Sequence, residues 1–170
     1  MLGIGEIGLD YFYSQDENII LKQKALFCSQ IELAISLNLP IEIHARDAWG
    51  DIWNILKGYP QIHGKFLIHC FTGNTQELKN CFDLGGKAAF GGIVTFPKSV
   101  DLQEAAIFCP SDSMVLETDL PFLAPVPNRG KTCEPALIND TAIFMAKLKN
   151  TTPEQIWEWS RENSKSLFGV

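Results

Sequence analysis

The sequence predicts an α/β fold with a parallel sheet, of the TIM-type β/α barrel class. Short apolar runs alternate with segments of helical periodicity along all 170 residues, which is typical of β/α repeats. The runs are continuously apolar, as expected for strands covered on both faces. Four of five runs end in a residue that can bind metal, and barrel enzymes take their catalytic groups from several strand ends. The alternative, a doubly wound sheet, usually builds its site at one switch point.

The five predicted strands are apolar runs bounded by turn or loop residues. They cover residues 2–7, 40–44, 65–69, 87–91 and 113–117. The fourth has the weakest pattern because it contains mostly small residues, which have low strand propensity.

Predicted helices fill the intervals between the strands. They cover residues 17–37, 47–57, 75–84, 102–108 and 136–149, and a last helix begins at Thr152. In the first helix, Phe27, Ile31 and Ala34 share an apolar stripe at helical spacing. The last helix has a threonine N-cap, proline at its first position and a glutamine that completes a capping box.

Composition predicts one cytoplasmic domain that covers residues 1–170. No linker or low-complexity segment divides the chain, and no apolar run approaches the roughly 20 residues that span a bilayer, so we expect no membrane partner. The 5 cysteines are odd in number and form no CxxC pair, which favours free thiols. The net charge of −6 argues against a protein that tracks nucleic acid through a basic groove. This net charge does not exclude an enzyme that binds one phosphate through a bound metal ion.

The residues at the strand ends are Glu6, His44, His69 and Asp119. Any one of them alone is weak support, since a single strand-end histidine is commonly a structural imidazole. Together they are harder to explain as packing, because burying such groups without partners costs free energy. Mixed histidine and carboxylate ligands suit Zn, Mn or Mg. The third histidine, His63, lies in a polar loop and is predicted to be a surface residue.

Four motifs carry a resemblance to a known family. They are residues 5–11 (GEIGLDY), 43–48 (IHARDA), 68–73 (IHCFTG) and 117–125 (ETDLPFLAP). In order and spacing they resemble the signatures of the TatD-type metal-dependent deoxyribonucleases, and the match covers nearly the whole chain. Residues 127–135 resemble that family's loop after the last strand, although Cys133 stands where relatives tend to carry asparagine.

The resemblance implies a β/α barrel with a two-metal site that hydrolyses DNA by metal-activated water. Glu6 would bridge both ions, and His44 and His69 would complete one site. Asp119 would belong to the other site and would take the proton from the attacking water. Cys70 is predicted to point to the opposite face of its strand, without a catalytic role.

Arg46 and Arg129 are the candidates for binding a substrate phosphate, because the N–H donors of a guanidinium match the geometry of the phosphate oxygens. The alternative for each is a structural ion pair, with Asp47 for the first and Glu134 for the second.

One departure from the family is large, because its first strand carries a His-x-His pair that this chain lacks. The five strands would correspond to strands four to eight of the eight-stranded barrel, with one metal site intact and the second incomplete. Such an open barrel exposes edges at residues 2–7 and 113–117, which promotes association. We therefore expect a complementing N-terminal fragment, a homo-oligomer, or a sequence that is part of a longer product.

Two other functions stay open at this point. The chain could be a half-barrel without catalysis that acts as a binding or assembly subunit. It could also hydrolyse an amide or lactone on a related barrel, although the motifs at residues 68–73 and 117–125 speak against this.

Overall fold

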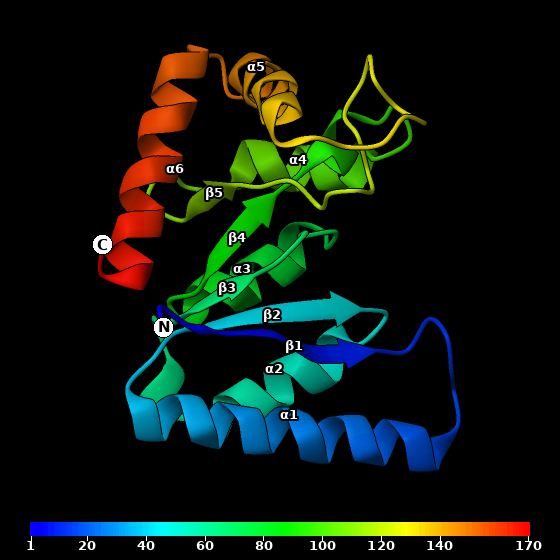
Figure 1. The fold of residues 1–170 in the computed structure, drawn as a ribbon, viewed down its shortest axis with the longest axis vertical. Helices are drawn as coiled ribbons and strands as arrows, with labels where there is room; N and C mark the ends of the chain where they lie inside the picture. Colours follow the sequence, from blue (N-terminus) through cyan, green and yellow to red (C-terminus); the bar gives the residue numbers. More distant parts are fainter.

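The computed structural model describes residues 1–170 and contains one parallel sheet with the strand order β1-β2-β3-β4-β5 (Figure 1). The strands are β1 (Ile4–Asp10), β2 (Ile41–Arg46), β3 (Phe66–Ile68), β4 (Lys87–Phe90) and β5 (Met114–Leu116). Neighbours in sequence are neighbours in the sheet, and every pair is parallel. The predicted α/β class with a parallel sheet is therefore confirmed.

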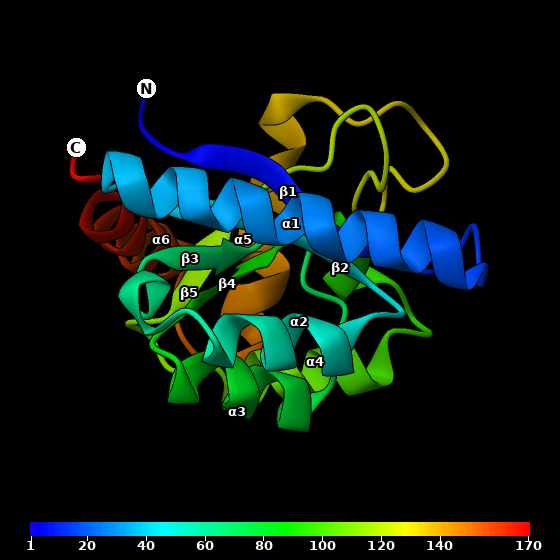
Figure 2. The same ribbon diagram turned by 90° about the horizontal axis from the view of Figure 1, so that it is seen from below.

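Six α-helices connect or follow the strands. They are α1 (Glu17–Leu37), α2 (Trp49–Lys57), α3 (Thr75–Asp83), α4 (Val100–Phe108), α5 (Ile138–Leu148) and α6 (Pro153–Phe168). Helices α2, α3 and α4 lie side by side along one face of the sheet (Figure 2). No helix is both long enough and apolar enough to cross a membrane.

Capping side chains set where several helices begin. The Asp16 carboxylate accepts hydrogen bonds from two backbone N–H groups in the first turn of α1, and Asn74 does the same for α3. The Thr152 hydroxyl accepts from the backbone N–H of Gln155, which confirms the predicted N-cap of α6. The first helix has the bounds that its apolar stripe predicted, with Phe27, Ile31 and Ala34 buried.

The two faces of the sheet differ in chemistry, because side chains alternate along a strand. The face toward the helices is apolar and belongs to a core of 33 buried residues, among them Ile43, Ile68 and Phe90. The other face contributes Leu67, Ala89 and Val115 to a small apolar cluster that also contains Leu167 of α6. His44 and His69 follow on this second face, toward the carboxyl ends of the strands, so the fold separates the packing face from the site.

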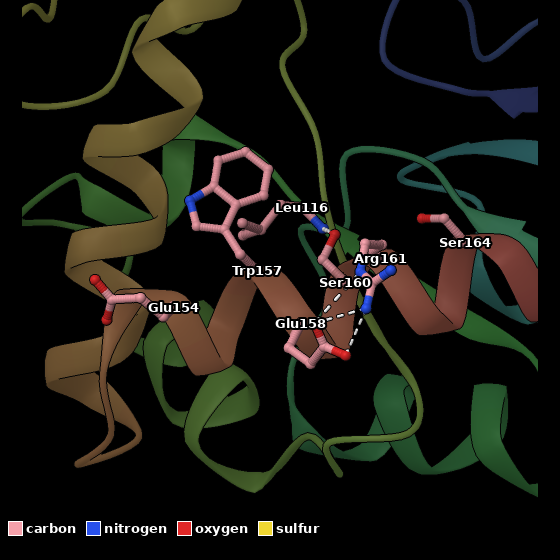
Figure 3. Close-up of a pocket in the computed structure, with 7 residues that line it drawn as sticks. All are labelled: Leu116, Glu154, Trp157, Glu158, Ser160, Arg161 and Ser164. Carbon is pink, nitrogen blue, oxygen red and sulfur yellow. Dashed lines mark hydrogen bonds and ion pairs between the residues drawn. The ribbon is translucent and has the colours of Figure 1, made fainter.

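Both edges of the sheet are partly covered by side chains. At the β1 edge, Asp10 donates its N–H to Gln23 and accepts from the Gln23 amide, both at 2.8 Å. At the β5 edge, the Ser160 hydroxyl accepts from the N–H of Leu116 at 2.9 Å (Figure 3), and Asn163 donates to the carbonyl of Met114 at 2.7 Å. The predicted edges are thus the true sheet edges, with some backbone groups satisfied locally.

Candidate metal centre

The predicted metal ligands converge on one cavity of about 540 Å³. Glu6 comes from β1, His44 from β2, His69 directly follows β3, and Asp119 lies beyond β5. They meet because the carboxyl ends of parallel strands lie along one rim. Glu6 and His44 lie inside their strands and not at the ends, since β1 runs on to Asp10 and β2 to Arg46.

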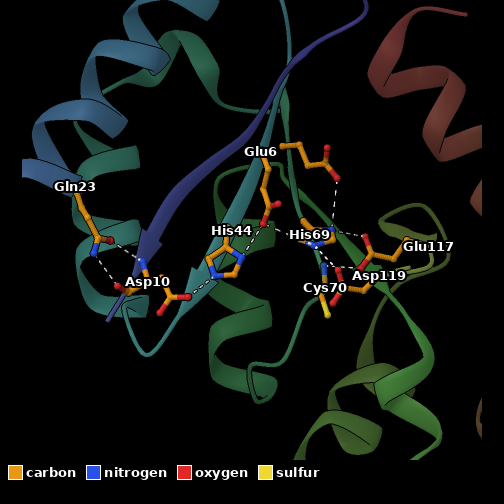
Figure 4. Close-up of polar contacts among 9 residues, drawn as sticks. Glu6, Asp10, Gln23, His44, His69, Cys70, Glu117 and Asp119 are labelled. Atoms are coloured by element: carbon orange, nitrogen blue, oxygen red, sulfur yellow. Dashed lines mark hydrogen bonds and ion pairs between the residues drawn. The ribbon is translucent and has the colours of Figure 1, made fainter. Parts of the chain in front are cut away.

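His44 is held between two carboxylates. Its Nδ1 lies 2.7 Å from Oε1 of Glu6, and its Nε2 lies 3.2 Å from Oδ2 of Asp10. Asp10 is itself positioned through its backbone by Gln23 of α1. Figure 4 shows the Glu6 carboxylate between His44 and His69.

His69 presents each ring nitrogen to a carboxylate. Its Nε2 lies 3.8 Å from Oε1 of Glu6 and 3.6 Å from Oδ1 of Asp119, while its Nδ1 lies 3.0 Å from Oε2 of Glu117. Two ligands of one tetrahedral ion, each bonded at about 2.0–2.2 Å, lie roughly 3.3–3.6 Å apart. The Nε2 side therefore has donors of the right type for a divalent metal, one at the upper limit of this spacing and the other 0.2 Å beyond it.

Glu117 fixes the orientation of His69. One oxygen accepts from the N–H of Cys70 at 2.7 Å and the other faces Nδ1 of His69. Such a carboxylate selects the tautomer that leaves Nε2 free to bind metal. Burial alone would lower the pKa of His69, but the hydrogen bond to Glu117 and the nearby carboxylates raise it to about 9. A metal that binds Nε2 at neutral pH must therefore displace a proton.

Sequence reasoning missed three carboxylates of this site, namely Asp10, Glu42 and Glu117. Glu42 Oε1 lies 3.6 Å from Nδ1 of His69, and Glu42, His69 and Glu117 can each offer a ligand atom within 4.8 Å of the others. A signal was present, because Glu42 and Glu117 stand two positions before His44 and Asp119. That spacing places a side chain on the same face of an extended segment.

The prediction for Cys70 is wrong in its geometry. The cysteine lines the cavity with the metal ligands. Strand β3 ends at Ile68 and Cys70 has a positive φ of 40°, so the alternation of a strand does not extend to it. Burial raises the pKa of its thiol far above the usual range, which keeps it protonated. All 5 cysteines are free thiols.

The two arginines lie over aromatic rings. The Arg46 guanidinium is 3.7 Å from the centroid of Phe12, and that of Arg129 is 4.3 Å from the centroid of Phe96. Arg46 lines the cavity. His63 is half-buried and contacts the carbonyl of Leu56 through Nε2 at 3.1 Å, so it is less exposed than predicted.

A parallel β/α sheet with histidines and carboxylates on one rim defines the scaffold of a barrel-type metal site. The chain matches the sequence profile of the family described as TatD related DNase over residues 1–169. It therefore belongs to this family, and the resemblance drawn from the four motifs is confirmed.

The relatives are longer than this chain. The uncharacterized metal-dependent hydrolase YabD of Bacillus subtilis is 41% identical over 172 residues, covering the whole chain and 66% of its own length. YcfH of Escherichia coli, also described as an uncharacterized metal-dependent hydrolase, is 36% identical, and the chain spans 63% of it. The crystal structure of YJJV, a TatD homologue from Escherichia coli, superposes with a TM-score of 0.92 at 27% identity, covering 99% of this chain and 64% of YJJV.

Proposed function

We propose that this chain carries the metal centre of a phosphodiesterase that hydrolyses DNA. The observation that carries the proposal is the convergence of two histidines and several carboxylates on one cavity at the carboxyl ends of parallel strands. A divalent metal, when bound, supplies positive charge that neutralises a phosphoester and activates water. The family description, TatD related DNase, supports this substrate.

The proposed roles follow the resemblance and the positions of the residues. Glu6, His44 and His69 hold one ion of Mg, Mn or Zn. Asp119 belongs to a second position, which has fewer ligands in this chain and binds more weakly, and it accepts the proton of the attacking water. Arg46 and Arg129 bind the substrate phosphate, because a guanidinium stacked on a ring keeps its in-plane N–H donors available.

We further propose that residues 1–170 form one cytoplasmic domain whose strands correspond to strands four to eight of an eight-stranded barrel. The strand order supports this correspondence, because strands that follow one another in the sequence are neighbours in the sheet. The chain also covers only 63–66% of the length of its longer relatives. β/α units from outside this chain would then cover the edges of β1 and β5.

A stripe on α1 supports such a covering partner. Ile19, Leu26, Leu33 and Leu37 are exposed and recur at steps of seven, seven and four residues, which places them on one flank of the helix. The opposite flank faces α2 and the turn after it: Lys24 pairs with Asp51, and Glu32 accepts from the Tyr59 hydroxyl. The stripe thus points away from α2, where the helix of a preceding β/α unit would pack.

We expect the chain in isolation to associate with a second copy through this stripe. Light scattering after size exclusion should give a mass above the 19.0 kDa of one chain. The double substitution Leu26→Lys and Leu33→Lys should lower it to the monomer, because it places charges on the apolar flank. Leu21→Lys, exposed but off the stripe, is the matched control. A wild-type monomer at every concentration would contradict this proposal.

Nuclease activity with added Mn tests the proposed function directly. We expect His69→Ala to lower the rate of DNA hydrolysis by at least about 100-fold, because it removes a metal ligand and the contact of that ligand with Glu117. His63→Ala is the matched control, since His63 does not line the cavity, and it should retain wild-type activity. Equal residual activity in wild type and His69→Ala would favour the alternative, a binding or assembly subunit without catalysis.

A further inference from the structure

The carboxylate of Asp10 has a fixed orientation relative to His44. Its Oδ1 accepts a hydrogen bond from the backbone N–H of Phe12 at 2.9 Å, and its Oδ2 lies 3.2 Å from Nε2 of His44. Because the first oxygen is bonded to the backbone, the second cannot turn away from the imidazole without breaking that bond. Asp10 therefore presents a hydrogen-bond acceptor to Nε2 of His44.

The two histidines of the metal centre share this arrangement but use opposite ring nitrogens. One oxygen of Glu117 accepts from the N–H of Cys70 at 2.7 Å, and the other lies 3.0 Å from Nδ1 of His69. The remaining nitrogens are Nδ1 of His44 and Nε2 of His69, and both face Oε1 of Glu6. Each ring thus has one nitrogen against a backbone-anchored carboxylate and the other toward the same oxygen.

Helix α1 fixes the backbone that carries the Asp10 carboxylate. The Gln23 side-chain amide accepts from the N–H of Asp10 and donates to its carbonyl, both at 2.8 Å (Figure 4). The next residue of each element is also connected. The Tyr11 hydroxyl donates to Oδ2 of Asp51 at 2.8 Å, and Nζ of Lys24 lies 2.7 Å from the same oxygen. Two consecutive residues of α1 therefore hold two consecutive residues at the end of β1.

A neutral imidazole has one N–H group and one nitrogen with a free lone pair. If His44 binds a metal through Nδ1, its proton is on Nε2, and the group that faces Nε2 must accept a hydrogen bond. We propose that Asp10 is a positioning residue that sets His44 to bind the metal through Nδ1, and that Gln23 holds Asp10 in place. This role rests on the proposed function and extends the metal centre to two residues that supply no ligand atom.

Comparing Asp10→Asn with Asp10→Ala separates this role from a purely structural one. The amide of asparagine has one oxygen, so its NH₂ group must face either the N–H of Phe12 or the Nε2–H of His44. Alanine presents no opposing donor, and water can replace the carboxylate. We expect Asp10→Asn to lower the Zn affinity by roughly 10- to 100-fold in calorimetric titration, and Asp10→Ala to lower it less. Asp101→Asn, exposed on α4, is the matched control.

A purely structural role predicts the reverse order, because asparagine preserves the turn at Phe12 and alanine does not. Asparagine would then bind Zn like wild type, and alanine would bind it more weakly. The reverse order, or an unchanged affinity in Asp10→Asn, would overturn the positioning role.

Gln23→Met tests the contribution of α1. It leaves the N–H and the carbonyl of Asp10 without their partner, so we expect a loss of Zn affinity of about ten-fold, the lower limit for such supporting contacts. Gln30→Met is the matched control, because Gln30 lies two turns along the same flank of α1 and outside the cavity. Wild-type affinity in Gln23→Met would remove Gln23 from this role.

Nitrogen NMR of the imidazole rings in the Zn-loaded chain identifies the nitrogen that binds the metal. The chain has only 3 histidines, so their signals can be assigned. We expect the His44 proton on Nε2 and the metal on Nδ1, and the opposite assignment would contradict the role of Asp10. If wild type binds Zn and hydrolyses DNA while Asp10→Asn binds Zn normally, only this inference fails. If wild type binds no Zn, the proposed function fails with it.

Discussion

Replacing Glu6 with glutamine is expected to lower the affinity for Zn or Mn by roughly 100-fold or more. Oε1 of Glu6 lies 2.7 Å from Nδ1 of His44 and 3.8 Å from Nε2 of His69, so one carboxylate oxygen faces both histidines. The amide keeps the shape but removes the negative charge that a divalent cation requires. Calorimetric titration of the metal-free chain measures this affinity directly.

The number of bound ions sharpens this prediction. We expect one tight ion per chain in the wild type, held by Glu6, His44 and His69, and at most weak binding of a second near Asp119. Glu104→Gln, on the exposed side of α4, is the matched control and should bind metal like wild type. Two tight ions would contradict the assignment of a single complete site, and an unchanged affinity in Glu6→Gln would remove Glu6 from the centre.

The fold could be predicted well because its signals are local. The buried apolar stripe of Phe27, Ile31 and Ala34 and the polar residues around it predicted that α1 begins at residue 17 and ends at residue 37, where the structure has these ends. Strand ends were less certain. β1 extends three residues beyond its predicted end, since Gly8, Leu9 and Asp10 pair with His44, Ala45 and Arg46 of β2. Such pairing depends on a neighbour that lies more than 30 positions away.

The candidate site was predictable in its ligand types but not in their supporting contacts. The position of each histidine after an apolar run placed it on the rim. Glu117 contacts both His69 and the backbone of Cys70. This depends on how far β3 and β5 are offset along the strand direction, and these two strands share no hydrogen bonds. The stacking of Arg46 on Phe12 likewise needs the path of the loop after β1, which no periodicity specifies.

Gly8→Ala is expected to destabilise the chain by about 3 kcal/mol or more, the largest effect on folding that we predict. Gly8 has a φ of +143°, a conformation that L residues rarely adopt, and it pairs with His44 across the β1–β2 interface. A Cβ at this position would lie 2.0 Å from the backbone oxygen of His44. That oxygen belongs to the backbone of β2, which is paired with β1 and β3, and it cannot rotate away as a side chain could.

Gly130→Ala separates the cost of the backbone conformation from the cost of this clash. Gly130 also has a positive φ, of +89°, but an added Cβ would meet nothing within 4 Å. Alanine at this position should lower the free energy of unfolding by only about 1 kcal/mol, measured by urea unfolding.

Because β1 carries Glu6 and β2 carries His44, the shift that relieves the clash at Gly8 must also move these ligands apart. Gly8→Ala should therefore lose metal affinity together with stability, whereas a variant within about 1 kcal/mol of wild type would refute the close strand contact beneath the site.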